Sequence, residues 1–316
     1  MSGECINQEI HGGWALYNGD CCEVMQSLPD DSMGLSVFSP PFSNLFVYSN
    51  SERDMGNCRT DEEFLEHFSY MVRELWRITV PGRLAVVHCI DLPLHKFKDG
   101  VVGLKDFPGQ IIRCFDDCGW TYHSRVTIWK DPVVEMTRTK ALGLLHKQIC
   151  KDSAQCRQGC ADYLVVFRKP CDVPPQPVAH PEGFRPEDYV GEMRDECRTS
   201  VEVWQRYASP VWFDIRQTHV LNAAVARSDK DERHICPLQL DVIERAIHLW
   251  SNEGDVVFSP FAGIGSEIYC AVKMKRRGVG IELKPEYYRQ AVKNVSQMER
   301  QMSAGSLLDM LRVENG

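Results

Sequence analysis

Short apolar runs alternate with amphipathic stretches along most of the chain, and this alternation limits the folds open to it. Runs of strand length and apolar, β-branched or aromatic content lie at 14–19, 34–39, 82–90, 121–130, 161–169, 254–261 and 279–283. Stretches with helical spacing of apolar residues lie between them, at 61–79, 107–120, 237–251, 265–278 and 284–302. A strand, a helix and a second strand in succession form a right-handed parallel crossover. The sequence therefore predicts an α/β fold with a mainly parallel sheet flanked by helices.

One part of the chain breaks this alternation. Residues 170–186 are dense in proline, which neither helix nor strand interiors accept, and periodicity stays weak as far as about residue 233. We therefore expect three parts: residues 1–169, an irregular insert over 170–233, and residues 234–316. The regular parts before and after the insert are expected to belong to one folded domain.

Composition and charge narrow the class of protein. No apolar run approaches the length of about 20 residues that spans a bilayer, and the first ten residues lack a secretion signal, so we expect a cytoplasmic protein without a membrane partner. The net charge of −8 argues against general polyanion binding, although basic residues outnumber acidic ones over 130–169. The cysteines contain no Cys-x-x-Cys pair, and the spacing of His146, Cys150, Cys156 and Cys160 is not typical of zinc, so we expect no metal.

A glycine-containing turn follows the run at 254–261. Gly263 and Gly265 in "SPFAGIGSE" permit a sharp turn and a close approach of the backbone to a ligand. The next strand ends at Glu282, an acid placed to accept both hydroxyls of a ribose. Because Ile268 stands where a dinucleotide fingerprint has its third glycine, a nucleoside cofactor without a pyrophosphate fits better than NAD.

A second motif follows the run at 34–39. Ser39, Pro40, Pro41 and Phe42 come directly after an apolar strand, where a single proline would be enough to end it. Alone, this motif is also consistent with a rigid strand exit.

Together, Ser-Pro-Pro-Phe and Phe-x-Gly-x-Gly resemble the motifs of the S-adenosylmethionine-dependent amino-methyltransferases of DNA, which methylate N4 of cytosine or N6 of adenine. The motif order is similar to their circularly permuted β group, over roughly residues 14–169 and 233–297. The resemblance implies a Rossmann-like methyltransferase fold, S-adenosyl-L-methionine as cofactor and double-stranded DNA as partner. It also implies that 1–169 is the catalytic half, 170–233 a candidate target-recognition region, and 234–316 the cofactor-binding half.

The resemblance carries over residue by residue. Ser39, Pro40, Pro41 and Phe42 match the catalytic motif, Glu282 the ribose-binding acid, and Asp20 the acid that contacts the adenine amino group of the cofactor. The full cofactor set is Asp20, Phe38, Pro237, Ser259, Pro260, Phe261, Ala262, Gly263, Gly265, Glu282 and Leu283. Two positions depart from the family: Ser259 replaces the aspartate that often begins the glycine loop, and Cys236 replaces a lysine before Pro237.

The chemistry explains the catalytic motif. An exocyclic amine is a poor nucleophile because its lone pair is delocalised into the ring, and acceptors that bind its hydrogens favour a pyramidal nitrogen. We expect Ser39 Oγ and the Pro40 carbonyl to be these acceptors, held by the restricted backbone of two prolines. Phe42 would stack on a flipped base.

The target base is left open between cytosine and adenine. A serine at the first motif position resembles the cytosine enzymes of the family, so Ser39 favours N4 of cytosine over N6 of adenine. Two other classes stay as alternatives, a methyltransferase of RNA or protein amides and a non-catalytic nucleic-acid-binding module.

Contacts with DNA are expected from basic residues outside the two motifs, namely Arg53, Arg59, Arg138, Lys140 and Lys147. The sequence leaves open the recognition site, whether the chain forms a homodimer, and whether it has a restriction partner.

Overall fold

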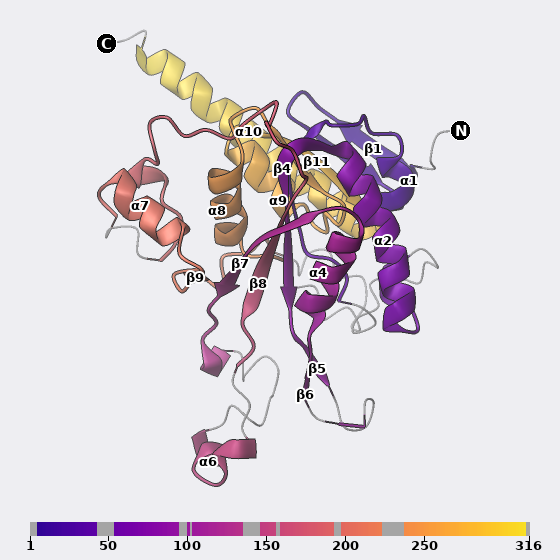
Figure 1. The fold of residues 1–316 in the computed structure, drawn as a ribbon. Helices are drawn as coiled ribbons and strands as arrows, with labels where there is room; N and C mark the ends of the chain where they lie inside the picture. Colours follow the sequence, from indigo (N-terminus) through magenta and orange to yellow (C-terminus); the bar gives the residue numbers. More distant parts are fainter. Residues whose placement is uncertain are drawn as a thin grey trace.

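The computed structural model describes residues 5–42, 54–94, 100–101, 103–134, 146–155, 159–192, 197–222 and 237–313. These residues form a nine-stranded sheet in the order β1-β2-β11-β10-β3-β4-β8-β7-β9 (Figure 1). Its strands are β1 (Asn7–Ile10), β2 (Trp14–Asn18), β3 (Met33–Phe38), β4 (Thr79–Ile90), β7 (Thr121–Ile128), β8 (Asp162–Arg168), β9 (Val211–Trp212), β10 (Val256–Ser259) and β11 (Arg277–Glu282). A separate hairpin pairs β5 (Leu92–Leu94) with β6 (Gly103–Lys105).

Helices pack against both faces of this sheet. The described helices of the chain are α1 (Cys21–Met25), α2 (Asp61–Ile78), α4 (Phe107–Asp117), α6 (His146–Ile149), α7 (Ser200–Tyr207), α8 (Leu240–Trp250), α9 (Ser266–Lys273) and α10 (Pro285–Val313). In Figure 1, α2 and α4 lie on one side of the sheet and α8, α9 and α10 on the other. The expected α/β fold with a mainly parallel sheet flanked by helices is confirmed.

Adjacent residues of the central strands belong to two different hydrophobic cores, one on each face of the sheet. Phe38 and Val87 pack with α1, α2 and α4, whereas their neighbours Val37 and Val86 pack with α8 and α9. Successive side chains of a strand point to opposite faces, and both faces here are covered by helices. This explains why these strands read as continuous apolar runs in the sequence.

The direction of the strands brings distant segments to one edge of the sheet. β2, β11, β10, β3 and β4 are parallel to one another, so their carboxyl ends lie together. β8 is antiparallel to β4, and its first residue, Asp162, pairs with Ile90 near the end of β4. Residues from the N-terminal and C-terminal parts of the chain therefore lie together at the carboxyl edge, because β10 and β11 lie between β2 and β3 in the sheet.

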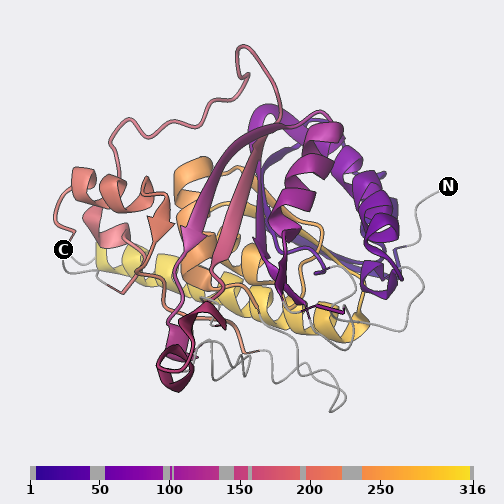
Figure 2. The same cartoon turned by 60° about the horizontal axis from the view of Figure 1, so that its bottom comes forward.

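The insert packs against the sheet and α8. Its β9 pairs in parallel with β7, and Ala179 donates a backbone hydrogen bond to Asn252 beyond the end of α8. Figure 2 shows the proline-rich connection running outside the sheet before the chain reaches α7. The described part of the insert is thus attached to the nine-stranded sheet by a strand as well as by side-chain packing.

Several elements differ from the sequence expectation. β4 begins at Thr79 rather than at residue 82, and a register shift between Met33 and Leu35 accommodates the extra residues. β1, the β5–β6 hairpin, α6, α7 and β9 were not expected. The signal for α7 was present, because Thr199 and Glu202 form a capping box before the helix. Among the described helices, none is long and apolar enough to cross a membrane.

Candidate active site

The serine motif lies at the carboxyl edge, immediately after β3. Pro40 is buried, and Ser39, Pro41 and Phe42 are half-buried. Ser39 Oγ is hydrogen-bonded to Nδ1 of His88 at 2.8 Å, and the ring of Phe42 meets the His88 ring edge-on at 6.5 Å between centroids. The serine is therefore tied to β4 rather than free in solvent.

A chain of polar contacts continues behind His88. Its Nε2 lies 3.2 Å from Oδ2 of Asp162, and Oδ1 of the same carboxylate lies 2.5 Å from Nζ of Lys130. Asp162 is only 2% exposed, and burial alone would raise its pKa, but the contacts with His88 and Lys130 lower the pKa below its ordinary value. The carboxylate is therefore ionised at neutral pH.

The glycine loop follows β10 at the same edge. Gly263 and Gly265 both have positive φ, at 53° and 86°. A Cβ on Gly265 would lie 3.0 Å from Cβ of Ala291 on α10, so glycine allows the helix to approach the loop here. A Cβ on Gly263 would meet nothing within 4 Å among the described residues, so the backbone at this position faces open space.

The two motifs are in direct contact although more than 200 residues separate them. The rings of Phe38 and Phe261 lie 5.9 Å apart between centroids. Ser259, at the end of β10, is fully buried, and its hydroxyl has no hydrogen-bond partner in the described part of the chain. The sheet thus joins the serine motif and the glycine loop into one site.

Glu282 ends β11 beside the glycine loop. Its carboxylate accepts hydrogen bonds from the backbone N–H groups of Gly263 and Lys284, both at 2.8 Å. Burial, with a smaller contribution from the charge of Asp54, raises the pKa of Glu282 to about 7 despite these two donors. This edge of the sheet therefore holds a carboxyl group that titrates near neutrality.

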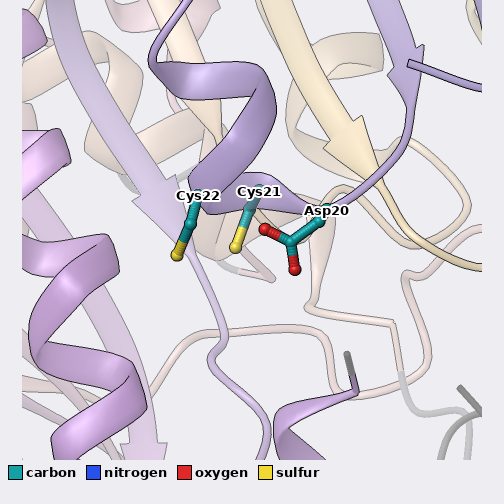
Figure 3. Close-up of side chains that lie close together, drawn as sticks. All are labelled: Asp20, Cys21 and Cys22. Atoms are coloured by element: carbon teal, nitrogen blue, oxygen red, sulfur yellow. The ribbon is translucent and has the colours of Figure 1, made fainter. Parts of the chain in front are cut away.

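Asp20 lies at the end of β2, next to β11, where Gly19 N–H donates to the Glu282 carbonyl at 3.1 Å. Figure 3 shows its side chain beside those of Cys21 and Cys22 in the first turn of α1. Their possible ligand atoms lie within 4.8 Å of one another. A hydrogen bond to Cys22 and burial raise the pKa of the Cys21 thiol well above its ordinary value, and a protonated thiol is a weak metal ligand. Asp20 Oδ1 accepts from Glu23 N–H and caps α1.

The other expected residues are divided between the site and the surface. Pro260 and Ala262 are buried in the glycine loop, Leu283 is half-buried and its carbonyl accepts from Asn18, and Pro237 is half-buried ahead of α8. Arg59 is exposed before α2, and Lys147 is exposed on α6, which Figure 1 places beyond the carboxyl edge. Arg53, Arg138 and Lys140 lie outside the described residues, as does Cys236.

Four residues of the site were not expected from the sequence: His88, Asp162, Lys130 and Asp54. His88 interrupts the apolar strand run "LAVVHCI", and Asp162 begins the apolar strand run "DYLVVF". A charged or titratable group in such a run is costly unless it is paired. That signal marks both residues as candidates, but only the pairing of β4 with β8 shows that they meet.

The fold and this edge define a methyltransferase, and comparison with known proteins identifies the family. The family model described as DNA methylase, of the N6/N4 type, matches residues 33–293. The chain therefore belongs to the N4/N6 amino-methyltransferase family of DNA methylases. It is an S-adenosyl-L-methionine-dependent DNA methyltransferase.

Individual relatives are similar over most of the chain. The type II methyltransferase M.MjaI of Methanocaldococcus jannaschii is 25% identical over 82% of this chain and 84% of its own length. TTHA0409 of Thermus thermophilus, solved with S-adenosyl-L-methionine, has a TM-score of 0.62 and 24% identity, with 90% of this chain and 93% of that chain covered. The cytosine-N4-specific PvuII DNA methyltransferase has a TM-score of 0.53 at 15% identity, with 92% of both chains covered. These two structures share the fold.

The residues present fit S-adenosyl-L-methionine. The open space at Gly263, where an added Cβ would have no neighbour within 4 Å among the described residues, leaves room for a ligand against the loop backbone. The carboxylate of Glu282 lies beside this space, because its Oε2 accepts a hydrogen bond from Gly263 N–H at 2.8 Å. The hydroxyl of Ser259, which has no hydrogen-bond partner among the described residues, is a further polar group at the start of the loop, without the charge that the usual aspartate would bring.

Proposed function

We propose that this enzyme methylates the exocyclic amino group of a base flipped out of duplex DNA, with N4 of cytosine preferred to N6 of adenine. The observation that carries this proposal is the position of Ser39 Oγ, which is hydrogen-bonded to His88 Nδ1 at 2.8 Å and belongs to the residue directly before Pro40. This oxygen and the Pro40 carbonyl belong to the motif next to the glycine loop, which Phe38 touches through Phe261. Serine at the first motif position supports the cytosine assignment.

The serine motif would bind and orient the amine. Ser39 Oγ and the Pro40 carbonyl each accept one N–H of the amino group, which directs the nitrogen lone pair away from them. Fixed acceptors need no rearrangement as positive charge develops on the nitrogen. The two prolines restrict the backbone, and Phe42 offers an aromatic face to the base.

The cofactor would be held by the loop and by two carboxylates. When bound, S-adenosyl-L-methionine supplies the methyl group as an electrophile. Glu282 accepts the ribose hydroxyls and Asp20 the adenine amino group, while Gly263 and Gly265 let the backbone approach. Phe38, Pro237, Ser259, Pro260, Phe261, Ala262 and Leu283 complete the surroundings.

Cofactor affinity should depend on pH because Glu282 has a pKa of about 7 in the free enzyme. The ionised carboxylate accepts the ribose hydroxyls, so protonation below pH 7 should weaken binding by about tenfold per pH unit, while affinity above pH 8 stays constant. Calorimetric titration at pH 6 in two buffers of different ionisation enthalpy should show that binding releases a proton, and titration at pH 9 should show none.

The control is Glu267, another buried acid of the loop region, whose pKa burial raises to about 8. Glu267→Gln should keep the pH dependence centred near 7, whereas Glu282→Gln should remove it and lower affinity at high pH. Dependence on pH that persists in Glu282→Gln would contradict the role of this carboxylate.

The DNA would lie along the carboxyl edge of the sheet. We propose that residues 1–169 and 234–316 are the catalytic and cofactor-binding halves, and that the insert at 170–233 takes part in target recognition. Arg53, Arg59, Arg138, Lys140 and Lys147 are proposed phosphate contacts. The type II relatives support a role in modifying a specific DNA site, as in restriction–modification.

The assignment is tested by the modified nucleoside. The purified enzyme is incubated with labelled S-adenosyl-L-methionine and duplex DNA of a mixed-sequence library, and the products are digested and identified by mass spectrometry. We expect N4-methylcytosine. N6-methyladenine as the sole product would replace cytosine by adenine as the target, and label transferred only to RNA supplied in competition would overturn the DNA assignment.

A further inference from the structure

A continuous chain of four polar side chains crosses the catalytic edge. It begins at Ser39 after β3, passes through His88 of β4 and Asp162 of β8, and ends at Lys130 after β7. The step from Ser39 to His88 is a hydrogen bond of 2.8 Å, whereas the other two steps are ion-pair contacts of 3.2 and 2.5 Å that do not meet hydrogen-bond geometry. His88 is 8% exposed and Asp162 2% exposed, so solvent contributes little to these contacts.

The charges of these four side chains determine which atom donates the proton in the hydrogen bond between Ser39 and His88. Asp162 is ionised, and a carboxylate beside Nε2 favours the neutral imidazole tautomer that carries its proton on that nitrogen. Nδ1 is then an acceptor, and Ser39 O–H donates to it. The lone pairs of Ser39 Oγ stay available for an N–H donor, which is the state that an amine acceptor requires.

We propose that His88 is a positioning residue that orients the Ser39 hydroxyl and takes its proton as the amine is methylated, with the Asp162 carboxylate, paired to Lys130, stabilising the imidazolium that forms. This inference rests on the proposed role of Ser39 as an amine acceptor and adds a destination for the proton that the amine must lose.

Atoms and charges balance in this step. The amine nitrogen forms a bond to the methyl carbon while the carbon–sulfur bond of the cofactor breaks, which leaves a neutral thioether and a positive nitrogen. The nitrogen gives one proton to Ser39 Oγ, and the hydroxyl proton of Ser39 moves to His88 Nδ1. The products are a neutral methylated amine, an intact serine and an imidazolium beside the Asp162 carboxylate. The proton then leaves His88 for solvent, and the enzyme returns to its starting state.

A purely structural role would not need this arrangement. Asp162 and Lys130 already form an ion pair, which compensates the buried carboxylate without a third group. His88 instead lies between the carboxylate and the serine, with one ring nitrogen to each. Among the described residues, the charged group beside the ring is Asp162 from β8, and behind it lies Lys130 from the end of β7.

The first test is His88→Asn in the full-length enzyme. The asparagine carbonyl takes the place of Nδ1 and still accepts from Ser39, but it cannot take a proton. At saturating cofactor and DNA, the single-turnover rate should fall by about 100-fold or more. A proton on Nδ1 would remove the acceptor for Ser39, so the rate of the wild type should decrease in acid, and this decrease should be absent from the variant. Circular dichroism and cofactor binding serve as checks that the variant is folded.

The second test uses two variants that move the pH profile in opposite directions. Asp162→Asn removes the anion beside the imidazole, so the acidic decrease should shift to lower pH. Lys130→Met removes the cation that offsets that anion, so the decrease should shift to higher pH. Shifts of the same sign, or none in either variant, would overturn the assignment of Asp162 and Lys130.

The outcomes separate this inference from the function on which it rests. If Ser39→Ala is as active as the wild type, the proposed role of the serine fails. If Ser39→Ala is inactive but His88→Asn keeps the wild-type rate and pH profile, the serine role stands and the inference about His88 is wrong. A slow His88→Asn enzyme that keeps the acidic decrease would show a structural role only.

Discussion

Replacing Ser39 by alanine should lower the single-turnover rate of methyl transfer by about 100- to 1,000-fold, the usual cost of removing one fixed hydrogen-bonding group from a developing charge. The substitution removes the oxygen that is hydrogen-bonded to His88 at 2.8 Å and that we propose to accept an amine hydrogen. Cofactor affinity should change little, because the proposed cofactor residues lie mainly at or just after the ends of β2, β10 and β11. Rapid-quench kinetics with preloaded enzyme measure the rate, and calorimetry measures the affinity.

Ser36 provides the matched control on the same strand. It is fully buried, and its hydroxyl has no hydrogen-bond partner in the described part of the chain. Ser36→Ala should therefore leave the rate within about twofold of the wild type, because the substitution removes no hydrogen bond formed in the described part of the chain. Equal losses in both variants would indicate damage to β3 rather than loss of an acceptor.

Replacing Arg245 by methionine should lower the free energy of unfolding by about 3–5 kcal/mol, because it leaves a buried carboxylate unpaired. Arg245 on α8 is fully buried, and its guanidinium contacts Asp214 at 3.0 Å and the Val190 carbonyl at 2.6 Å. The rings of Tyr207 and Trp212 flank it at 4.7 and 4.8 Å. Urea unfolding followed by fluorescence measures the change.

Two further variants test whether the loss of stability comes from the unpaired carboxylate. Arg289→Ala breaks an exposed ion pair with Glu286 on α10 and should cost less than about 1 kcal/mol. Adding Asp214→Asn to Arg245→Met should recover part of the loss, because the unpaired charge is then absent. If Arg245→Met is as stable as the wild type, the insert does not depend on this buried pair for its attachment to α8.

Much of the site could be predicted from local sequence. The serine motif, the glycine loop and Glu282 each follow an apolar run, and the carboxyl ends of parallel strands meet at one edge of a sheet. The contact between Phe38 and Phe261 and the bond from Gly263 to Glu282 agree with that expectation. Family resemblance added Asp20, which no local pattern singles out.

The rest of the site depends on strand pairing. His88 and Asp162 are far apart in the sequence, and they meet because β4 and β8 are antiparallel with Ile90 opposite Asp162. A shift of one residue in that pairing would turn Asp162 to the other face of the sheet. The register follows from packing of both faces against helices, which no window of the sequence contains.

The cage around Arg245 shows the same limit. Tyr189, Tyr207, Trp212 and Asp214 belong to the insert, whose weak periodicity indicated only an irregular region. Nothing near these residues in the sequence points to an arginine on α8. Their assembly depends on β9 pairing with β7, a contact between segments that are distant in the chain.

The α/β class, the family and the two motifs could be predicted from local sequence, because periodicity, turn residues and short motifs are local properties of the chain. The polar groups that support Ser39, the attachment of the insert to the sheet and the pKa of Glu282 near 7 follow only from the tertiary structure. These properties arise from burial and from contacts between distant strands, and both are set only when the whole sheet has formed.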